Sequence, residues 1–153
     1  MNECKTSSEQ SCYRNVLTAY NYLVREKNIK PESIVIYGRS LGTGIAAYLA
    51  YVLNKQNINT KGLILISPFA SFLKSYVDHS LEGDIFCTDR LAKEITDRTL
   101  IIHGNSDWVV LYRNGVRLSS LFPNSVLVTI DGVGHCDIRT EQYYDSIREF
   151  VNK

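Results

Sequence analysis

Residues 33–43, Ser-Ile-Val-Ile-Tyr-Gly-Arg-Ser-Leu-Gly-Thr, decide the fold. A short β-branched apolar run, Ile34–Ile36, leads into the pattern Gly38-x-Ser40-x-Gly42, and a helical pattern follows. This order is typical of a nucleophile elbow, a tight turn that holds a serine hydroxyl above the end of a strand and at a helix N-terminus. We expect strained backbone at Ser40, and a collision for any side chain placed at Gly38 or Gly42. An ordinary glycine-rich turn between a strand and a helix is the alternative.

The length and composition of the chain fit one globular domain. Its 153 residues are enough to bury a hydrophobic core, and 44% hydrophobic with 22% charged residues is ordinary for a soluble protein. The net charge of +1, from 17 basic and 16 acidic residues, gives no sign of a nucleic-acid partner. No apolar run has membrane-spanning length, and the first residues lack the apolar core of a signal peptide. We therefore expect a single cytoplasmic domain over residues 1–153.

The cysteine pattern favours reduced thiols over a disulfide framework. Cys4, Cys12, Cys87 and Cys136 form no C-x-x-C pair and show no metal-ligand spacing. Cys136 follows His135 directly, but adjacent loop residues usually point apart, so we treat this cysteine as a bystander. No metal or organic cofactor is expected.

Apolar runs alternate with helical patterns along the chain. Strands are predicted at residues 34–36, 62–66, 99–102 and 126–130, and helices at about 9–27, 41–53, 112–121 and 141–151. Ser7 and Gln10 stand at capping-box spacing at the start of the first helix. Residues 70–97 are less periodic and predict a short helix near 72–77 and a helical piece near 89–95, which leaves little room for a large lid.

The predicted strands are continuous apolar runs separated by helices. This combination is typical of a parallel sheet with helices on both of its faces. The expected fold class is therefore α/β, with three α/β/α layers around about four parallel strands, corresponding to one domain without repeats or linkers.

The loops after the strands carry a base and an acid that match the serine. A serine hydroxyl is a weak nucleophile and needs a base, which in turn needs an orienting acid. Asp107 follows the third predicted strand and His135 the fourth, so all three groups lie at carboxyl strand ends, where sites in such sheets gather. Taken alone, Asp107 could cap its loop and His135 could be an ordinary loop histidine. Together, in the order Ser40, Asp107, His135, they predict a catalytic triad.

Other polar residues near the predicted site have less support. Asp131 is too close to His135 along the same loop to be its partner, and Asp137 is interpreted as a brace for that loop. His103 stands in a His-Gly-Asn sequence similar to some oxyanion-hole motifs, but its position directly before the acid loop favours a structural role. His79 is isolated and receives no role.

Four motifs in order carry a family resemblance. They are Tyr37-Gly38-Arg39-Ser40-Leu41-Gly42-Thr43-Gly44, Gly62-Leu63-Ile64-Leu65-Ile66-Ser67-Pro68-Phe69, Leu100-Ile101-Ile102-His103-Gly104 with Asp107, Val109 and Val110, and Gly132-Val133-Gly134-His135. They resemble the serine aminopeptidase-like α/β-hydrolases, close to the Bem-type and the depalmitoylase-like alpha/beta-hydrolase-domain subfamilies. The resemblance covers nearly the whole chain and implies Ser40 as nucleophile, His135 as base and Asp107 as acid. Leu111 departs from the proline usual after the paired valines, which affects loop rigidity and not the chemistry.

The resemblance also implies that the first half of this fold is missing from the sequence. Members of the family normally have several strands before the elbow strand, with a His-Gly motif whose loop supplies the second oxyanion-hole amide. The N–H of Leu41 can supply one donor, but the second has no visible source. The strand around Ile34–Tyr37 then becomes an exposed apolar edge that invites pairing with another chain. The missing strands have three explanations: a truncated sequence, assembly with a second chain that supplies them, or a non-catalytic remnant of the fold.

The expected function is that of a serine hydrolase acting on an ester, a thioester or an amide through an acyl-enzyme on Ser40. Its substrate would be a small molecule or an acyl compound, without a nucleic-acid partner. The first alternative is a non-catalytic binding or scaffold protein of the same fold, motivated by the absent oxyanion-hole strand. The second is self-association through the Ile34–Tyr37 edge.

Overall fold

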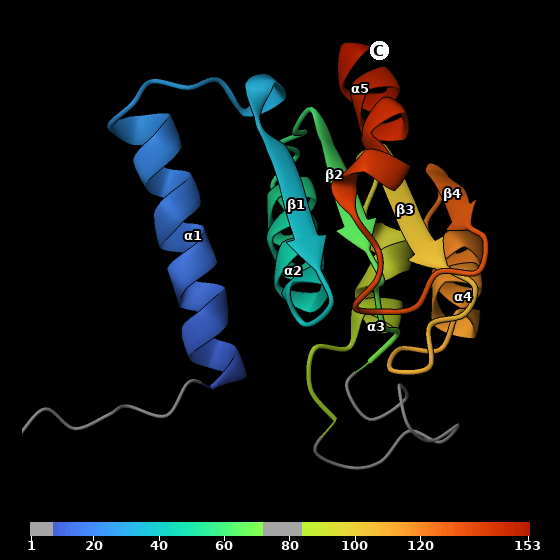
Figure 1. Cartoon of the computed structure of the whole chain (residues 1–153). Coiled ribbons are helices and arrows are strands. Elements are labelled where there is room, and N and C mark those ends of the chain that lie inside the picture. Colours follow the sequence, from blue (N-terminus) through green and yellow to red (C-terminus); the bar gives the residue numbers. More distant parts are fainter. Residues whose placement is uncertain (1–7, 72–83) are drawn as a thin grey trace, which may run out of the picture.

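The computed structural model describes residues 8–71 and 84–153. Four parallel strands form one sheet in the order β1-β2-β3-β4 (Figure 1). Their bounds are β1 Val35–Arg39, β2 Gly62–Ile66, β3 Thr99–Gly104 and β4 Ser125–Ile130. All four predicted strands are therefore present. The helix predicted near 72–77, and with it His79, lies outside the described residues, as do Cys4 and Ser7.

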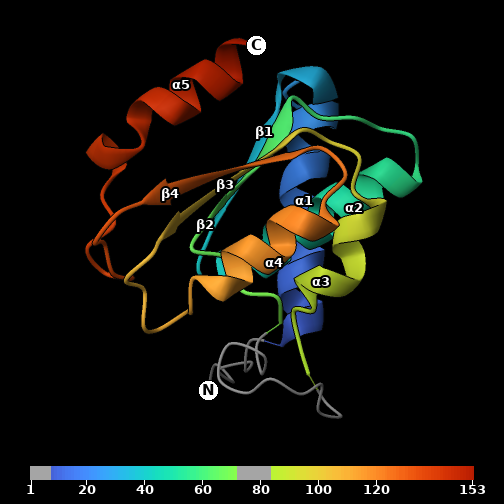
Figure 2. The ribbon, with the colours of Figure 1, turned by 90° about the vertical axis from the view of Figure 1, so that its right-hand side faces the viewer.

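Helices cover both faces of this sheet, as the sequence predicts. They are α1 Glu9–Arg25, α2 Gly42–Lys55, α3 Thr88–Leu91, α4 Arg113–Leu121 and α5 Tyr144–Asn152. Figure 2 shows α1 to α4 on one side of the strands and α5 on the other. Three short 3₁₀ turns complete the described elements, at Pro31–Ser33, Ala92–Glu94 and Thr140–Gln142. The fold is thus a three-layer α/β/α arrangement.

The predicted C-terminal helix is interrupted. A single helix was expected over residues 141–151, but the chain forms the turn Thr140–Gln142 and then α5, with Tyr143 between them. Tyr143 has φ −133° and ψ 8°, outside the helical region, and its side chain is buried. The apolar tyrosine ring packs into the core at this point, and the helix restarts after it.

The start of α1 corrects a second detail. The N-cap is Ser8, whose Oγ accepts a hydrogen bond from the Ser11 N–H at 3.2 Å, while the Ser11 Oγ accepts one from the Ser8 N–H at 2.9 Å. The predicted pair of Ser7 and Gln10 is therefore wrong by one residue. The first helical residue is Glu9, so the third position of the helix, where the reciprocal partner must stand, is Ser11.

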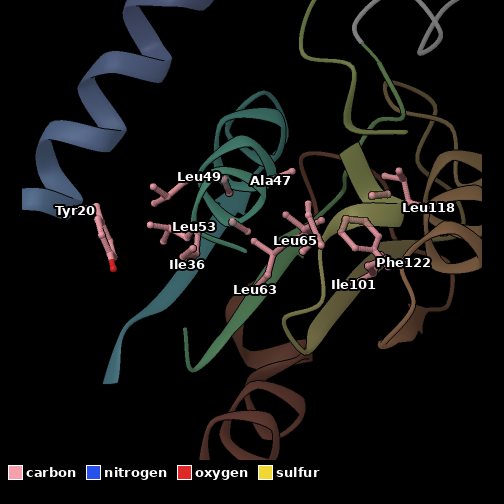
Figure 3. Packing of buried hydrophobic residues seen from close by; sticks show 14 residues of the cluster. Tyr20, Ile36, Ala47, Leu49, Leu53, Leu63, Leu65, Ile101, Leu118 and Phe122 are labelled. Carbon is pink, nitrogen blue, oxygen red and sulfur yellow. The ribbon is translucent and has the colours of Figure 1, made fainter. Parts of the chain in front are cut away.

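The two central strands are buried on both faces, which explains their continuous apolar sequences. Leu63, Leu65 and Ile101 face the α1–α4 layer and pack with Leu49 and Leu53 of α2 (Figure 3). The alternate residues of the same strands belong to a second cluster under α5, formed by Ile64, Ile66, Leu100, Ile102 and Phe150. The outer strands are less buried: β1 alternates between buried and exposed residues after Val35, and β4 has only half-buried and exposed residues. Because β2 and β3 are packed on both faces, the sheet holds the starting points of the loops that follow the strands.

Candidate active site

The turn after β1 has the strained geometry that the sequence predicts. Ser40 has φ +50°, in the left-handed region that only glycine enters easily. Its N–H donates to the Ile66 carbonyl of β2 at 2.9 Å, and its own carbonyl accepts from the N–H and the Oγ1–H of Thr43 at 2.9 and 2.6 Å. A Cβ added at Gly38 would lie 2.5 Å from the carbonyl oxygen of Gly42. Gly38 is therefore required for the close approach of β1 and α2.

The prediction that Gly42 is needed for the same reason is wrong. A Cβ at Gly42 would meet no described atom within 4 Å, because the tight contact involves the backbone of Gly42 and not the direction of its side chain. The crowded glycine in this helix is Gly44, where a Cβ would lie 2.6 Å from the Cβ of Phe86.

Ser40, His135 and Asp107 meet at one edge of the sheet. The Nε2 atom of His135 lies 3.0 Å from the Oγ of Ser40, and its Nδ1 atom lies 2.8 Å from the Oδ2 of Asp107. Ser40 follows β1, Asp107 follows β3 and His135 follows β4, so three loops at the carboxyl ends of parallel strands supply the three groups. Asp107 is buried and Ser40 is half-buried, so the acid end of the chain of hydrogen bonds is shielded from water.

The surroundings of Asp107 fix the protons of this chain of hydrogen bonds. Burial acts to raise the pKa of the Asp107 carboxyl, but hydrogen bonds from His103, His135 and the Val110 N–H outweigh it and lower the pKa to about 2. Asp107 is thus a carboxylate at neutral pH and can only accept, so the Nδ1 of His135 donates to it. The Nε2 of His135 is then free to accept the Oγ–H of Ser40.

Of the two other acidic candidates, Asp131 binds a side chain other than His135, and Asp137 lies beside Gly134. The Oδ1 of Asp131 accepts from the side-chain amide of Asn105 at 2.9 Å, and the amide oxygen of Asn105 accepts from the Gly132 N–H at 2.8 Å. Asp131 therefore links the loops after β3 and β4. Asp137 is exposed, and its Oδ2 lies 3.0 Å from the place of a Cβ on Gly134. Of the three acids, Asp107 is the one that the structure brings to the imidazole.

His103 stands behind the acid. It lies in β3 with a fully buried side chain, and its Nε2 is 2.9 Å from the Val110 carbonyl oxygen and 3.3 Å from the Oδ2 of Asp107. A buried ring cannot reach a substrate carbonyl, so this position agrees with the structural role that the sequence favours over an oxyanion role.

A model of the family described as alpha/beta hydrolase fold matches residues 10–138, which include Ser40, Asp107 and His135. The chain belongs to this family.

The relatives of this α/β-hydrolase chain are longer than it is. A protein of Acanthamoeba polyphaga mimivirus is 32% identical over 149 residues, which are 95% of this chain and 55% of that protein. The human alpha/beta hydrolase domain-containing protein 17C is 28% identical over 151 residues, which are 95% of this chain and 44% of that protein. The chain thus spans about half the length of the curated relatives it matches. These relatives agree with the family predicted from the four motifs.

Solved structures show the same fold. An alpha-beta hydrolase of Vibrio vulnificus is 27% identical with a TM-score of 0.76, covering 94% of this chain and 57% of that one. Est1E of Butyrivibrio proteoclasticus is 19% identical with a TM-score of 0.67, covering 96% of this chain and 72% of that one.

Two exposed apolar residues of this α/β-hydrolase domain directly follow Ser40 and Asp107 in the sequence. Leu41 follows Ser40 and is 45% exposed, and Trp108 follows Asp107 and is 81% exposed. Leu41 is also the N-cap residue of α2, at the positive end of the helix dipole.

Sequence reasoning missed two contacts at the site. The Nη2 of Arg39 donates to the His135 carbonyl at 3.2 Å, which ties the loop after β4 to the strand that carries the serine. The contact between His103 and Asp107 is the other. Arg39 shares the elbow motif, but nothing in a single sequence indicates that its partner lies 96 residues away.

The part of the chain that the structure describes shows no group of three or more His, Cys, Asp or Glu side chains that could hold a metal ion. Cys12, Cys87 and Cys136 form no disulfide. Within residues 8–71 and 84–153, none of the helices has both the length and the apolar character needed to cross a membrane.

Proposed function

We propose that this chain carries the nucleophile, base and acid of a serine hydrolase that cleaves an ester, thioester or amide bond through an acyl-enzyme. The observation that supports this proposal is a pair of consecutive hydrogen bonds. One joins the Ser40 Oγ and the His135 Nε2 at 3.0 Å, and the other joins the His135 Nδ1 and the Asp107 Oδ2 at 2.8 Å. Family membership supports hydrolase chemistry in general. The three residues and their roles are our proposal.

The proposed reaction begins with attack of the Ser40 Oγ on the carbonyl carbon of the substrate. The Nε2 of His135 takes the hydroxyl proton, and Asp107 stabilises the imidazolium without being protonated, since its pKa is about 2. The imidazolium gives the proton to the leaving alcohol, thiol or amine as the carbonyl–leaving-group bond breaks. Water then repeats the sequence on the acyl-enzyme and releases the acid, which regenerates the serine hydroxyl.

The oxyanion that forms during each attack needs donors close to Ser40. We assign the backbone N–H of Leu41 as one donor, because it follows the nucleophile directly and lies at the N-terminus of α2. In enzymes of this kind each such donor contributes roughly 10²–10³ in rate. We propose a small acyl compound as the substrate class, because Leu41 and Trp108, the residues that directly follow Ser40 and Asp107, have exposed apolar side chains.

The proposal is tested with the purified chain and p-nitrophenyl butyrate. We expect steady release of p-nitrophenol that falls to the uncatalysed background in Ser40→Ala and by about 10⁴ in Asp107→Asn, since an amide at that position favours the wrong imidazole tautomer. Ser33→Ala is the matched control, because Ser33 is an exposed serine in the turn before β1. Turnover by the unaltered chain that does not exceed that of Ser40→Ala would refute the proposal and favour a non-catalytic binding protein.

A further inference from the structure

We propose that His103 is a positioning residue, which fixes the Asp107 carboxylate so that its Oδ2 faces the Nδ1 of His135. The inference rests on the proposed function, because it names a residue that serves the same site. His103 does not touch the reacting atoms, and its effect on them passes through Asp107.

The hydrogen-bond partners of His103 assign its proton. Its Nε2 has two acceptors nearby, the Val110 carbonyl at 2.9 Å and the Asp107 Oδ2 at 3.3 Å. Both of these oxygens accept hydrogen bonds, and neither could bond to an Nε2 that carries only a lone pair. The Nε2 therefore carries a hydrogen and shares it between the two oxygens. The carboxylate oxygen that receives this hydrogen is the same one that accepts from His135 at 2.8 Å.

The other nitrogen of His103 shows that this ring is not simply a filler of the core. The Nδ1 atom is buried and has no hydrogen-bond partner among the described residues. Gly115 of α4 lies against it, and a Cβ at that glycine would be 2.6 Å from the Nδ1. A buried polar atom without a partner costs roughly 1–3 kcal/mol, a cost that an apolar side chain would avoid. The donor on the opposite side of the ring therefore accounts for the imidazole.

The effect on Asp107 follows from counting its donors. The Oδ1 accepts from the N–H groups of Val109 and Val110 at 3.0 and 2.8 Å, and the Oδ2 accepts from the two histidines. Without His103, only the Nδ1–H of His135 would hold the Oδ2, and the His135 ring changes its charge during the reaction as its Nε2 gains and loses a proton. His103 supplies an anchor that stays in place while His135 changes its charge.

Two substitutions separate this role from packing. His103→Gln keeps an N–H donor at the end of the side chain, and His103→Leu has similar bulk without a donor. With p-nitrophenyl butyrate we expect His103→Leu to lower kcat about 10–100-fold with KM unchanged, the size found when the support of a functional group is removed. His103→Gln should recover most of this loss. Thermal unfolding of both variants measures what they cost in stability.

Proton NMR supplies a readout that does not need turnover. The hydrogen between His135 and Asp107 should give a low-field resonance that disappears in Asp107→Asn. We expect this resonance to persist in His103→Gln and to shift or broaden in His103→Leu. If His103→Leu does not fold, Gly115→Ala tests the same contact, because its Cβ must displace the ring and should disturb the resonance in the same way.

The outcomes distinguish this inference from the function on which it rests. An active chain whose kcat and resonance are unchanged in His103→Leu would overturn the inference alone, as would equal losses in the Leu and Gln variants. A chain that shows the resonance and its dependence on His103, but no turnover above Ser40→Ala, would support the positioning role and refute the proposed function.

Discussion

Asp107 combines complete burial of its side chain with a carboxylate that stays ionised. Its two oxygens accept hydrogen bonds from two backbone N–H groups and two histidines. Burial alone would raise its pKa, but the hydrogen bonds from His103, His135 and the Val110 N–H lower it to about 2. In the unfolded chain the pKa returns to the ordinary value of about 3.8. The folded state therefore gains stability from this group at every pH above both values.

The corresponding prediction concerns unfolding in acid. Because the folded pKa is the lower one, the contribution is complete above about pH 4 and is lost as the pH falls toward 2, and it amounts to about 2 kcal/mol. Urea unfolding of the unaltered chain and of Asp107→Asn between pH 2 and pH 6 measures it. The difference in unfolding free energy between the two proteins should shrink by that amount as the pH falls. A difference that does not change with pH would contradict the assignment.

Among the secondary-structure elements, β1 makes a second contact with the site besides leading into Ser40, the proposed nucleophile. Arg39, its last residue, donates to the carbonyl of His135 and so connects the strand to the loop after β4. The loop after β3 also contacts the loop that carries His135, since the N–H of Ser106 donates to the Val133 carbonyl at 3.1 Å. The loop that carries His135 is thus held both by β1, which leads into Ser40, and by the loop after β3, which carries Asp107.

Removing the link from β1 should lower activity without changing the fold. We expect Arg39→Met to reduce kcat by roughly 2–10-fold, the equivalent of one ordinary hydrogen bond, while Arg39→Lys recovers part of the loss. Arg25→Met, at the exposed end of α1, is the control for loss of a surface charge. Steady-state kinetics with the same ester decides the matter, and equal kcat values for Arg39→Met and Arg25→Met would show that the link is irrelevant.

How much of this architecture can be predicted from the sequence depends on the range of the interactions. The strands and the meeting of Ser40, Asp107 and His135 are predictable, because continuous apolar runs imply parallel strands and parallel strands bring their ends together. The error at Gly42 arises because a motif names the glycines of a turn but not the direction in which each Cβ would point. The contact of His103 with Asp107 depends on the path of the loop after β3, which turns the Asp107 side chain back toward the strand, and a sequence pattern does not describe that path.

For the whole molecule, the layers on the two sides of the sheet should unfold together, as expected for one domain. Leu65 lies in the central strand β2, is fully buried, and packs in the cluster under α2, while its neighbour Ile64 packs under α5. We expect Leu65→Ala to lower the unfolding free energy by roughly 2–5 kcal/mol. The far-UV and near-UV circular dichroism of this variant should still change in one shared transition. Two separate transitions would contradict the single-domain interpretation.

The central claim is that the hydroxyl of Ser40 is an activated nucleophile, and covalent labelling tests it most directly. The chain is incubated with a fluorophosphonate, and its intact mass and labelled peptide are determined beside those of Ser40→Ala, His135→Ala and the control Ser33→Ala. We predict a single phosphonyl adduct on Ser40 in the unaltered chain and in Ser33→Ala, none in Ser40→Ala, and greatly slowed labelling in His135→Ala. A folded chain that takes up no label, or that is labelled equally after Ser40→Ala, would contradict the account.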